Sequence, residues 1–446
     1  MTPSFASVHD AISWLDSHVD FESNVPRRRS VPTLERMREL MDVLGDPEHA
    51  YPAIHLTGTN GKGSTAAMAS ALLSARGLSV GTYTSPNLSQ VNERISRSGS
   101  SIDDGSLREA LSTLSLVEPT LSDRPTRFEL LTAAAFSWFA DVAVDAAVVE
   151  VGVGGTWDAT NVIDGTVAVL TNVSYDHTDI LGPTLEGIAQ DKAGIVKPGS
   201  VAVVGEQDPS LVHVIRSVAD EAGAAQVWVR GQEFDCTSNR LAVGGRLVDL
   251  RTPGHVYTEV ALPLSGEHQG LNAACALAAV EAFFGAPLDP DVVAEGFALV
   301  SVPGRLEVVG RRPLCLLDGA HNVAGMQALS RALGDFAVAG RTVAVVGMLG
   351  GRDPTAMLAP LVGAGVRSLV ACAPASPRAQ SPEAVADAAG AAGMEVTVAG
   401  TVSDAVQIGR ELAGDEGMVV IAGSLYVVAE ARSLLVAQPT AVPPGH

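Results

Sequence analysis

Short runs of apolar residues alternate with alanine-rich stretches along most of this 446-residue chain. Each run is followed by Gly, Asp, Asn or Ser, and the runs lie within residues 51–58, 78–85, 145–152, 165–173, 341–348, 367–374 and 418–424. Fully apolar strands separated by helices are typical of βαβ units, in which helices cover both faces of a parallel sheet. The pattern therefore predicts an α/β fold that binds its ligands at the carboxyl ends of the strands.

Two further stretches set the domain organisation. Residues 230–265 alternate apolar and polar positions between short turns, which predicts a small antiparallel patch. Residues 265–285 form a long alanine-rich helical stretch, and Pro and Gly punctuate residues 300–313 before a new α/β series begins. We expect two domains: a parallel-sheet N-terminal domain with the antiparallel patch over 1–302, and a Rossmann-like α/β C-terminal domain over 303–446.

Composition narrows the class of protein. With 47% hydrophobic residues the chain can bury large cores, which excludes a disordered protein, and its net charge of −21 opposes nucleic-acid binding. No stretch approaches about 20 apolar residues, and the first residues lack the basic segment of a signal peptide. The four cysteines are too widely spaced for a zinc site or a dense disulfide framework. We therefore expect a cytoplasmic protein with free thiols and no membrane or nucleic-acid partner.

Lysine is rare in this chain. Of the 29 basic residues only three are lysines, namely Lys62, Lys192 and Lys197. Lysine differs from arginine in offering a compact ammonium for a phosphate, or a primary amine that can be modified. The positions of these three residues therefore bear on function.

An apolar strand, a glycine-rich turn and an alanine-rich helix follow one another within residues 53–68. Glycines let consecutive backbone N–H groups surround phosphate oxygens, and the start of a helix adds partial positive charge. In the usual P-loop a lysine reaches the β- and γ-phosphates and the next hydroxyl meets Mg²⁺. Here Leu56 replaces the first glycine of that pattern. The turn predicts ATP and Mg²⁺ binding by Gly58, Thr59, Asn60, Gly61, Lys62, Gly63 and Ser64.

This shortened loop resembles that of folylpolyglutamate synthase and dihydrofolate synthase, ATP-dependent amide ligases related to the muramyl peptide ligases. The muramyl enzymes usually have Thr or Ser directly after the lysine, so Gly63 favours the folate branch. The resemblance extends from about Arg36 to Arg432. Further segments that carry it, in family order, are 84–88, 91–95, 128–133, 149–152, 171–177, 191–199, 267–272, 303–305, 317–322 and 422–426.

The resemblance implies a set of magnesium ligands. It assigns Ser64, Ser85 and Glu150 to one Mg²⁺, and His177 together with a carbamylated Lys192 to a second. A lysine is chemically intelligible at position 192 because arginine cannot be converted into a carboxylate-like carbamate. By chemistry alone, Glu150 could be a solvated acid at a strand end, and His177 an ordinary loop histidine, since Mg²⁺ prefers oxygen ligands.

The resemblance also implies residues that bind the organic ligands. Asn272 and Arg305 are expected to contact the nucleotide, Asp318 and His321 the adenosine-phosphate or glutamate side of an interdomain cleft, and Ser424 the amino acid. The segment 318–322 alone is equally consistent with a helix cap.

The acceptor pocket is where the sequence departs from the family. Asp158 matches the residue that contacts the pterin ring. The family's bacterial pattern has Arg-Leu or Arg-Phe before it, whereas this chain has Thr156 and Trp157. Trp157 could stack on a flat ring, but the loss of the arginine leaves the shape of the pocket open.

The activity implied is an ATP-dependent acid–amino-acid ligase of folate biosynthesis. It would add L-glutamate to folate, to dihydropteroate or to both through an acyl phosphate, giving ADP and phosphate, with Lys62, Lys192 and His321 as the catalytic set. The family default is a monomer. The alternatives are a muramyl-type amino-acid ligase and a P-loop switch ATPase. The preferred acceptor, the length of the glutamate chain and the oligomeric state stay open.

Overall fold

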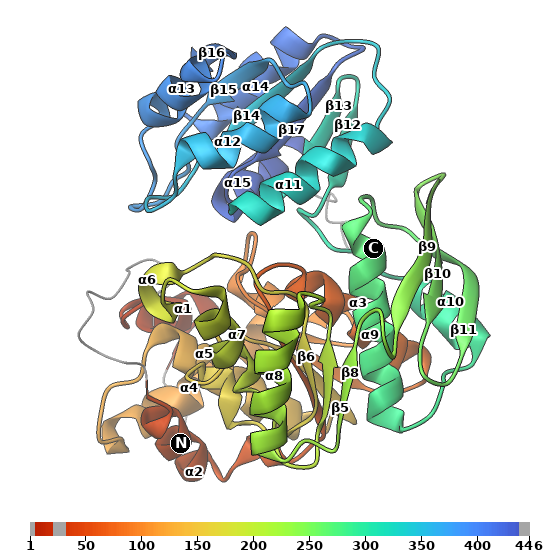
Figure 1. Cartoon of the computed structure of the whole chain (residues 1–446). Helices are drawn as coiled ribbons and strands as arrows, with labels where there is room; N and C mark the ends of the chain where they lie inside the picture. Colours follow the sequence, from red (N-terminus) through yellow and green to blue (C-terminus); the bar gives the residue numbers. More distant parts are fainter. Residues whose placement is uncertain (1–4, 21–32, 437–446) are drawn as a thin grey trace, which may run out of the picture. The chain divides into compact units, whose positions relative to one another are not determined.

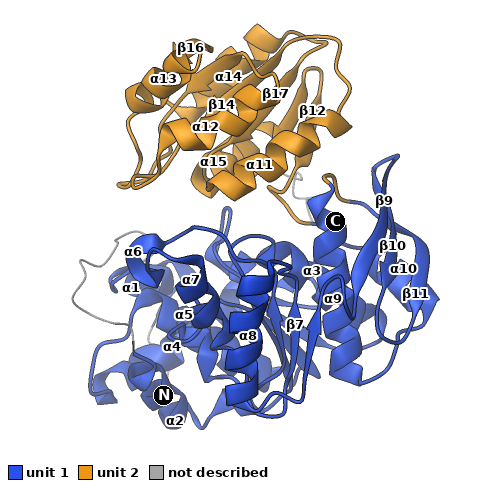
Figure 2. Cartoon of the chain, viewed as in Figure 1, with its two compact units in different colours: residues 1–263, 267–301 blue, residues 264–266, 302–446 orange. Residues whose placement is uncertain are grey.

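A computed structural model of the chain describes residues 5–20 and 33–436. The chain divides into two compact units (Figure 2), which are residues 1–263 with 267–301 (unit 1) and residues 264–266 with 302–446 (unit 2). Each unit combines helices with a mostly parallel sheet, so the predicted α/β class is confirmed. Within the described residues, none of the helices combines the length and hydrophobicity that crossing a membrane requires.

Unit 1 is built on an eight-stranded sheet with the order β4-β3-β2-β5-β1-β6-β7-β8. All neighbouring strands pair parallel except β3 with β2 and β4 with β3, which pair antiparallel. β1 lies between β5 and β6 and is buried along its whole length, as its apolar sequence predicts. The strands are β1 (Ala53–Thr57), β2 (Val80–Tyr83), β3 (Ile95–Arg97), β4 (Ser100–Ser101), β5 (Ala146–Glu150), β6 (Gly165–Leu170), β7 (Val201–Val204) and β8 (Gln226–Val229).

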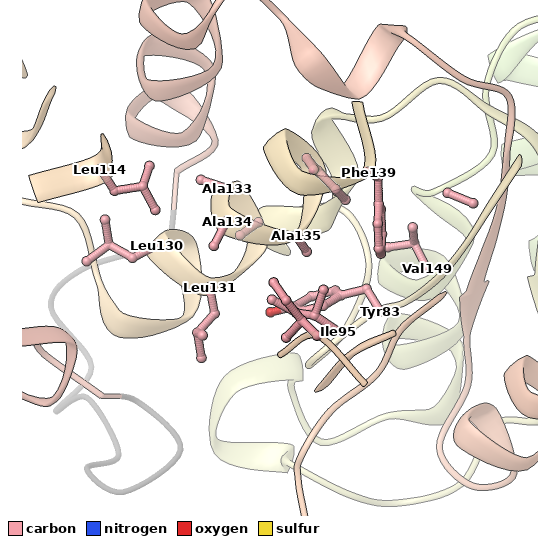
Figure 3. Packing of buried hydrophobic residues seen from close by; sticks show 14 of the residues in the cluster. Tyr83, Ile95, Leu114, Leu130, Leu131, Ala133, Ala134, Ala135, Phe139 and Val149 are labelled. Atoms are coloured by element: carbon pink, nitrogen blue, oxygen red, sulfur yellow. The ribbon is translucent and has the colours of Figure 1, made fainter. Parts of the chain in front are cut away.

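Helices cover both faces of this sheet (Figure 1). On one face, side chains of β2, α5 and β5 such as Tyr83, Phe139 and Val149 form a large hydrophobic core (Figure 3). Neighbouring strand residues point to the other face, where α3 and α9 pack against each other. The helices of unit 1 are α1 (Val8–Asp16), α2 (Glu35–Leu44), α3 (Lys62–Ala75), α4 (Asp104–Val117), α5 (Arg127–Asp141), α6 (Thr178–Leu181), α7 (Leu185–Ala193), α8 (Pro209–Ala222), α9 (His268–Phe284) and α10 (Pro290–Ala298).

The predicted antiparallel patch is present as a separate three-stranded sheet with the order β11-β10-β9. Its strands are β9 (Asp235–Ala242), β10 (Gly245–Arg251) and β11 (Val256–Leu262), all paired antiparallel. Alternating burial along β11 matches its alternating sequence, because one face of the sheet packs inward and the other meets solvent.

Unit 2 contains a six-stranded sheet with the order β12-β13-β17-β14-β15-β16, in which only the edge strand β12 is antiparallel. Its strands are β12 (Glu307–Arg311), β13 (Leu314–Leu317), β14 (Thr342–Val346), β15 (Ser368–Ala371), β16 (Glu395–Val398) and β17 (Met418–Ala422). Its helices are α11 (Val323–Ala332), α12 (Pro354–Gly363), α13 (Pro382–Ala391), α14 (Val402–Ala413) and α15 (Leu425–Leu435). β13 and β17 are neighbours and parallel, so the segments that follow them share one edge of the sheet.

Candidate active site

The glycine-rich turn connects β1 to the start of α3. The helix begins at Lys62, and Gly61 precedes it with a φ of 83°, a left-handed conformation that favours glycine. The Lys62 Nζ atom donates to the carbonyl oxygen of Gly58 at 3.0 Å and lies 3.4 Å from that of Thr59. The ammonium therefore folds back over the turn beside the N-terminus of a 14-residue helix. Such an end attracts phosphate groups.

The turn is braced by the segment that follows β6. The side-chain amide of Asn172 bonds both backbone groups of Asn60, accepting its N–H at 3.0 Å and donating to its carbonyl oxygen at 2.9 Å. The Thr171 hydroxyl also donates to that carbonyl, at 2.6 Å. Thr59 in turn exchanges hydrogen bonds with the backbone of Ser174. These residues were in a segment that the sequence analysis singled out, but their bracing role depends on strand order.

Two glycines of the turn have no room for a side chain. A Cβ atom at Gly58 would collide with the Thr171 hydroxyl, and one at Gly61 would collide with the side-chain oxygen of Asn272. Asn272 belongs to α9 and also bonds Gln269 through its amide nitrogen, at 2.9 Å. The structure thus brings one predicted nucleotide contact, Asn272, directly against the phosphate loop.

Glu150 ends β5 next to the start of α3. Its side chain is buried, and its Oε2 atom accepts the N–H of Ser85 at 3.1 Å. A Cβ atom at Gly63 would lie 3.4 Å from the same oxygen. The carboxylate therefore lies between the first turn of α3, which contains the buried Ser64, and the segment of Ser85 that follows β2.

This donor set fits a hard cation. Carboxylate and hydroxyl oxygens are the ligands that Mg²⁺ prefers, and it is usually held by one or two carboxylates. Among the residues that the structure describes, no three His, Cys, Asp or Glu side chains converge as a metal site. A cation beside Glu150 would consequently need the serine hydroxyls and the phosphates of a nucleotide as further ligands.

Lys192 reaches the phosphate loop from α7. It is buried, and its Nζ atom donates to the Gly58 carbonyl oxygen at 3.0 Å, the same acceptor that Lys62 uses. Burial, and then the charge of Lys62, lower the pKa of Lys192 to about 7 against the opposing effect of Asp191 and Asp176. A substantial fraction of this amine is therefore uncharged near neutral pH. An uncharged amine is the form that reacts with CO₂.

His177 and its neighbour Asp176 follow β6. His177 has a φ of 49° and precedes α6, and its Nε2 atom lies 3.9 Å from the Asp176 carboxylate. Asp176 is buried, and its charge acts on Lys192. The sequence analysis assigns no role to Asp176. The signal that could have found it is an acidic residue directly before the predicted ligand His177, just after an apolar strand.

The segment 152–161 carries the predicted pterin contacts. The carboxylate of Asp158 accepts the backbone N–H of Val153 and that of Thr160, both at 3.0 Å, and burial raises its pKa. The side chain of Trp157 is 50% exposed. Thr156, which stands in place of the family's arginine, bonds the carbonyl oxygen of Asp191 through its N–H and its hydroxyl. The departure from the family pattern therefore ties this segment to the helix that carries Lys192.

In unit 2, the predicted residues lie at the carboxyl ends of β13 and β17. Both carboxylate oxygens of Asp318 accept backbone N–H groups, from Leu306 at 3.0 Å and Ala320 at 2.9 Å. His321 Nδ1 lies 2.8 Å from the carbonyl oxygen of Gly319. Ser424 is buried and caps α15, accepting the N–H of Val427 at 3.2 Å.

These contacts also connect the segments of unit 2 with one another. The N–H of Gly423 bonds the carbonyl oxygen of Ala320 at 2.9 Å, which joins the segments that follow β17 and β13. A Cβ atom at Gly319 would lie 2.7 Å from the guanidinium of Arg305. Asp318, His321, Ser424 and Arg305 are thereby held in one region of unit 2.

Comparison with known proteins now identifies the family. The model of the Mur ligase middle domain matches residues 56–280, and that of the Mur ligase glutamate ligase domain matches residues 304–425. The dihydrofolate synthase/folylpolyglutamate synthase of Mycobacterium tuberculosis is 41% identical over 458 residues, covering 93% of this chain and 92% of that protein. The chain belongs to the folate branch of the Mur ligase family. The expected resemblance is confirmed.

Other relatives agree with this assignment. The folylpolyglutamate synthase of Lacticaseibacillus casei is 33% identical over 94% of this chain and 97% of its own length. The solved structure of M. tuberculosis folylpolyglutamate synthase complexed with ADP has a TM-score of 0.90 at 40% identity, covering 98% of this chain and 99% of that one. A bifunctional folylpolyglutamate synthase/dihydrofolate synthase with Mn, AMPPNP and L-glutamate bound has a TM-score of 0.83 at 29% identity, covering 96% and 98%.

Proposed function

We propose that this chain is an ATP-dependent ligase that joins L-glutamate to the carboxylate of a folate-type acceptor. Family membership supports the reaction class, because the relatives are named dihydrofolate synthase and folylpolyglutamate synthase. The observation that carries the proposal is the convergence of Lys62 and the buried amine of Lys192 on one carbonyl of the phosphate loop. A loop that merely bound nucleotide would not need the second lysine.

The reaction proceeds through an acyl phosphate. A carboxylate is a poor electrophile, so the γ-phosphoryl group of ATP is first transferred to a carboxylate oxygen of the acceptor, which releases ADP. The amine of L-glutamate then attacks the acyl carbon, and phosphate leaves as the amide forms and the amine loses a proton. Positioning and charge neutralisation supply most of the catalysis in phosphoryl transfer.

Unit 1 supplies the phosphate and metal ligands in this mechanism. The N–H groups of residues 58–64 and the Lys62 ammonium bind the phosphates, and Asn272 contacts the nucleotide. Oxygens of Ser64, Ser85 and Glu150 would hold one Mg²⁺; His177 and carbamylated Lys192 would hold a second. Bound Mg²⁺ neutralises the charge that develops on the phosphates. We accordingly assign ATP binding to residues 1–302.

Lys192 is prepared for carbamylation by its surroundings. The uncharged amine would attack CO₂ and lose one proton, which gives a carbamate with two oxygen donors. Arginine cannot follow this route because its guanidinium stays protonated. The charges of the buried Asp176 and the partly buried Asp191 oppose the loss of charge on the amine only partly, since the pKa of Lys192 is still lowered to about 7.

The remaining predicted residues bind the two organic substrates. Asp158 and Trp157 contact the pterin ring, with the half-exposed indole of Trp157 available for stacking. In residues 303–446, Arg305 and Asp318 serve the nucleotide, while His321 and Ser424 bind L-glutamate. The hydrogen bonds of Asp318 and Ser424 to backbone N–H groups hold the two segments in place, and His321 lies in the segment that begins with Asp318.

The test is glutamate ligation with dihydropteroate and tetrahydrofolate offered separately, with the products measured by mass spectrometry. The wild-type chain should form ADP and a glutamylated product only when ATP, acceptor and L-glutamate are all present. Lys62→Ala should lose ligation by at least about 100-fold, because it removes the charge that meets the developing phosphoryl charge, and should keep the fold. Lys197→Arg is the matched lysine control, since Lys197 bonds the Asn161 carbonyl rather than the phosphate loop.

Two outcomes would overturn the proposal. ATP hydrolysis that is indifferent to acceptor and glutamate would show a switch-type ATPase. Ligation of an amino acid to a nucleotide-sugar acceptor, with none to pterin acceptors, would show a muramyl-type ligase.

A further inference from the structure

A buried line of hydrogen bonds connects the middle of β1 with the segment that carries Asp158. His55 lies in β1 with no exposed surface, and its Nε2 atom is 2.8 Å from the hydroxyl oxygen of Thr160. That hydroxyl lies 2.5 Å from Oδ1 of Asp158. Thr160 is fully buried in a short 3₁₀ helix, Ala159–Val162, and Asp158 caps the start of this helix.

The direction of each hydrogen bond follows from the donors present. Asp158 already accepts two backbone N–H groups, from Val153 and Thr160, which is the role of an ionised carboxylate. The single proton of the Thr160 hydroxyl therefore goes to Asp158. The hydroxyl oxygen must then accept from His55, so the Nε2 atom of His55 carries the proton.

The other nitrogen of His55 supports this arrangement. Its Nδ1 atom is buried and has no hydrogen-bond partner. An unprotonated Nδ1 carries no N–H that needs an acceptor, which suits the neutral ring with its proton on Nε2. Complete burial, with a further effect from the charge of Lys197, lowers the pKa of His55 to about 3. The ring is therefore neutral throughout the physiological range.

A histidine at this point is costly for the fold alone. Both sequence neighbours, Ile54 and Leu56, are buried apolar residues, and burying a polar ring with one unpartnered nitrogen is unfavourable compared with an apolar side chain. What the histidine provides instead is a fixed hydrogen-bond partner on one side of the Asp158 carboxylate. Oδ1 of Asp158 receives both the Thr160 hydroxyl and the Thr160 N–H, whereas Oδ2 receives the N–H of Val153.

We propose that His55 is a positioning residue for acceptor recognition, which acts through Thr160 to fix the Asp158 carboxylate so that Oδ2 faces the N–H groups of the acceptor's pterin ring. This inference rests on the proposed function, because it takes Asp158 as the pterin contact. It extends the acceptor site to two residues that never touch the substrate. One of them lies on the strand that leads into the phosphate loop.

The experiment removes a hydrogen-bonding group at His55 and at Thr160 in separate variants. At each position a second variant keeps a group that can form the hydrogen bond. His55→Leu removes the donor and keeps an apolar volume, while His55→Gln provides an amide N–H at a similar reach. Thr160→Val removes the hydroxyl with little change of shape, and Thr160→Ser keeps it. KM values for dihydropteroate and for ATP, kcat, and the thermal unfolding midpoint are measured for each variant.

We expect His55→Leu and Thr160→Val each to raise KM for dihydropteroate by about five- to twentyfold, the lower part of the range for a buried hydrogen bond lost with its partner left unsatisfied. KM for ATP and kcat should change by less than about threefold. His55→Gln and Thr160→Ser should stay within about threefold of the wild type in all three constants. The double variant His55→Leu/Thr160→Val should resemble either single variant, because both break the same line.

A merely structural role gives a different result. Lower unfolding midpoints with an unchanged KM for dihydropteroate, or equal increases in KM for ATP and acceptor, would overturn the inference. If His55→Leu does not fold, Thr160→Val decides, because it lies outside the strand. Failure of the proposed function is distinguishable: the wild-type chain would then add no glutamate to any pterin acceptor. If the wild type adds glutamate but the variants keep its KM for dihydropteroate, only the role of His55 is rejected and the proposed function stands.

Discussion

The brace between Asn172 and the phosphate loop gives the sharpest prediction. Asn172→Ala removes two hydrogen bonds to Asn60, at 3.0 and 2.9 Å, while the backbone bond from the Thr59 N–H to residue 172 stays. The Asn60 carbonyl keeps the Thr171 hydroxyl as a donor, but the Asn60 N–H loses the acceptor that Asn172 provided. The loss of two hydrogen bonds to the backbone of Asn60 amounts to about 2–3 kcal/mol.

That free energy should appear in nucleotide affinity. The wild-type loop is held in its binding conformation before ATP arrives, whereas the variant must order the loop on binding. A loss of about 2–3 kcal/mol corresponds to a Kd for ATP that is about 30- to 150-fold higher. Isothermal titration calorimetry with a non-hydrolysable ATP analogue measures it directly.

Thr401→Ala is the matched control. It removes the side-chain cap of α14 in unit 2, where the Thr401 hydroxyl oxygen accepts the N–H of Asp404 at 3.1 Å. Loss of such a cap costs about 1 kcal/mol of stability and should leave the Kd for ATP unchanged. An Asn172→Ala protein that is folded and binds the analogue within twofold of the wild type would refute the bracing argument.

Three further predictions concern neighbouring residues. Lys192→Arg should abolish ligation because arginine stays protonated and cannot form a carbamate, with ATP affinity reduced less than tenfold; retained turnover would show that no carbamate acts there. Gly61→Ala should weaken ATP binding by at least about tenfold, since a left-handed φ costs about 1–2 kcal/mol and the new methyl group collides with Asn272. A crystal structure with the loop unmoved would contradict this. Finally, His55 has a pKa of about 3 when folded against about 6.5 when unfolded. The titration of His55 therefore costs no stability well above about pH 6.5. As pH falls toward 3, stability is lost because the unfolded chain takes up a proton that the buried ring does not. Relative to His55→Gln, the wild type should lose about 2 kcal/mol of unfolding free energy between pH 7 and pH 5 in urea titrations.

Much of the fold follows from local sequence. Apolar runs that end in small polar residues specify buried parallel strands, and the glycine-rich turn before an alanine-rich helix specifies a phosphate loop. Both patterns are confined to short segments of the chain. The antiparallel patch was equally readable from its alternation over 230–265. The sequence shows that the few lysines of the chain fall in two segments, one with Lys62 and one with Lys192. It does not show that these two segments meet in the fold.

What the tertiary structure decided is which strand exits are neighbours. β1 and β6 are adjacent although more than a hundred residues separate Asn60 from Asn172, so the brace depends on strand order and is invisible to any local pattern. The same holds for Asn272 against Gly61, and for His55, which reads as an ordinary strand residue until Thr160 is placed beside it. Periodicity records which face a side chain takes, because that depends on the residue's own strand or helix. The partner it meets on that face is set by how distant segments pack.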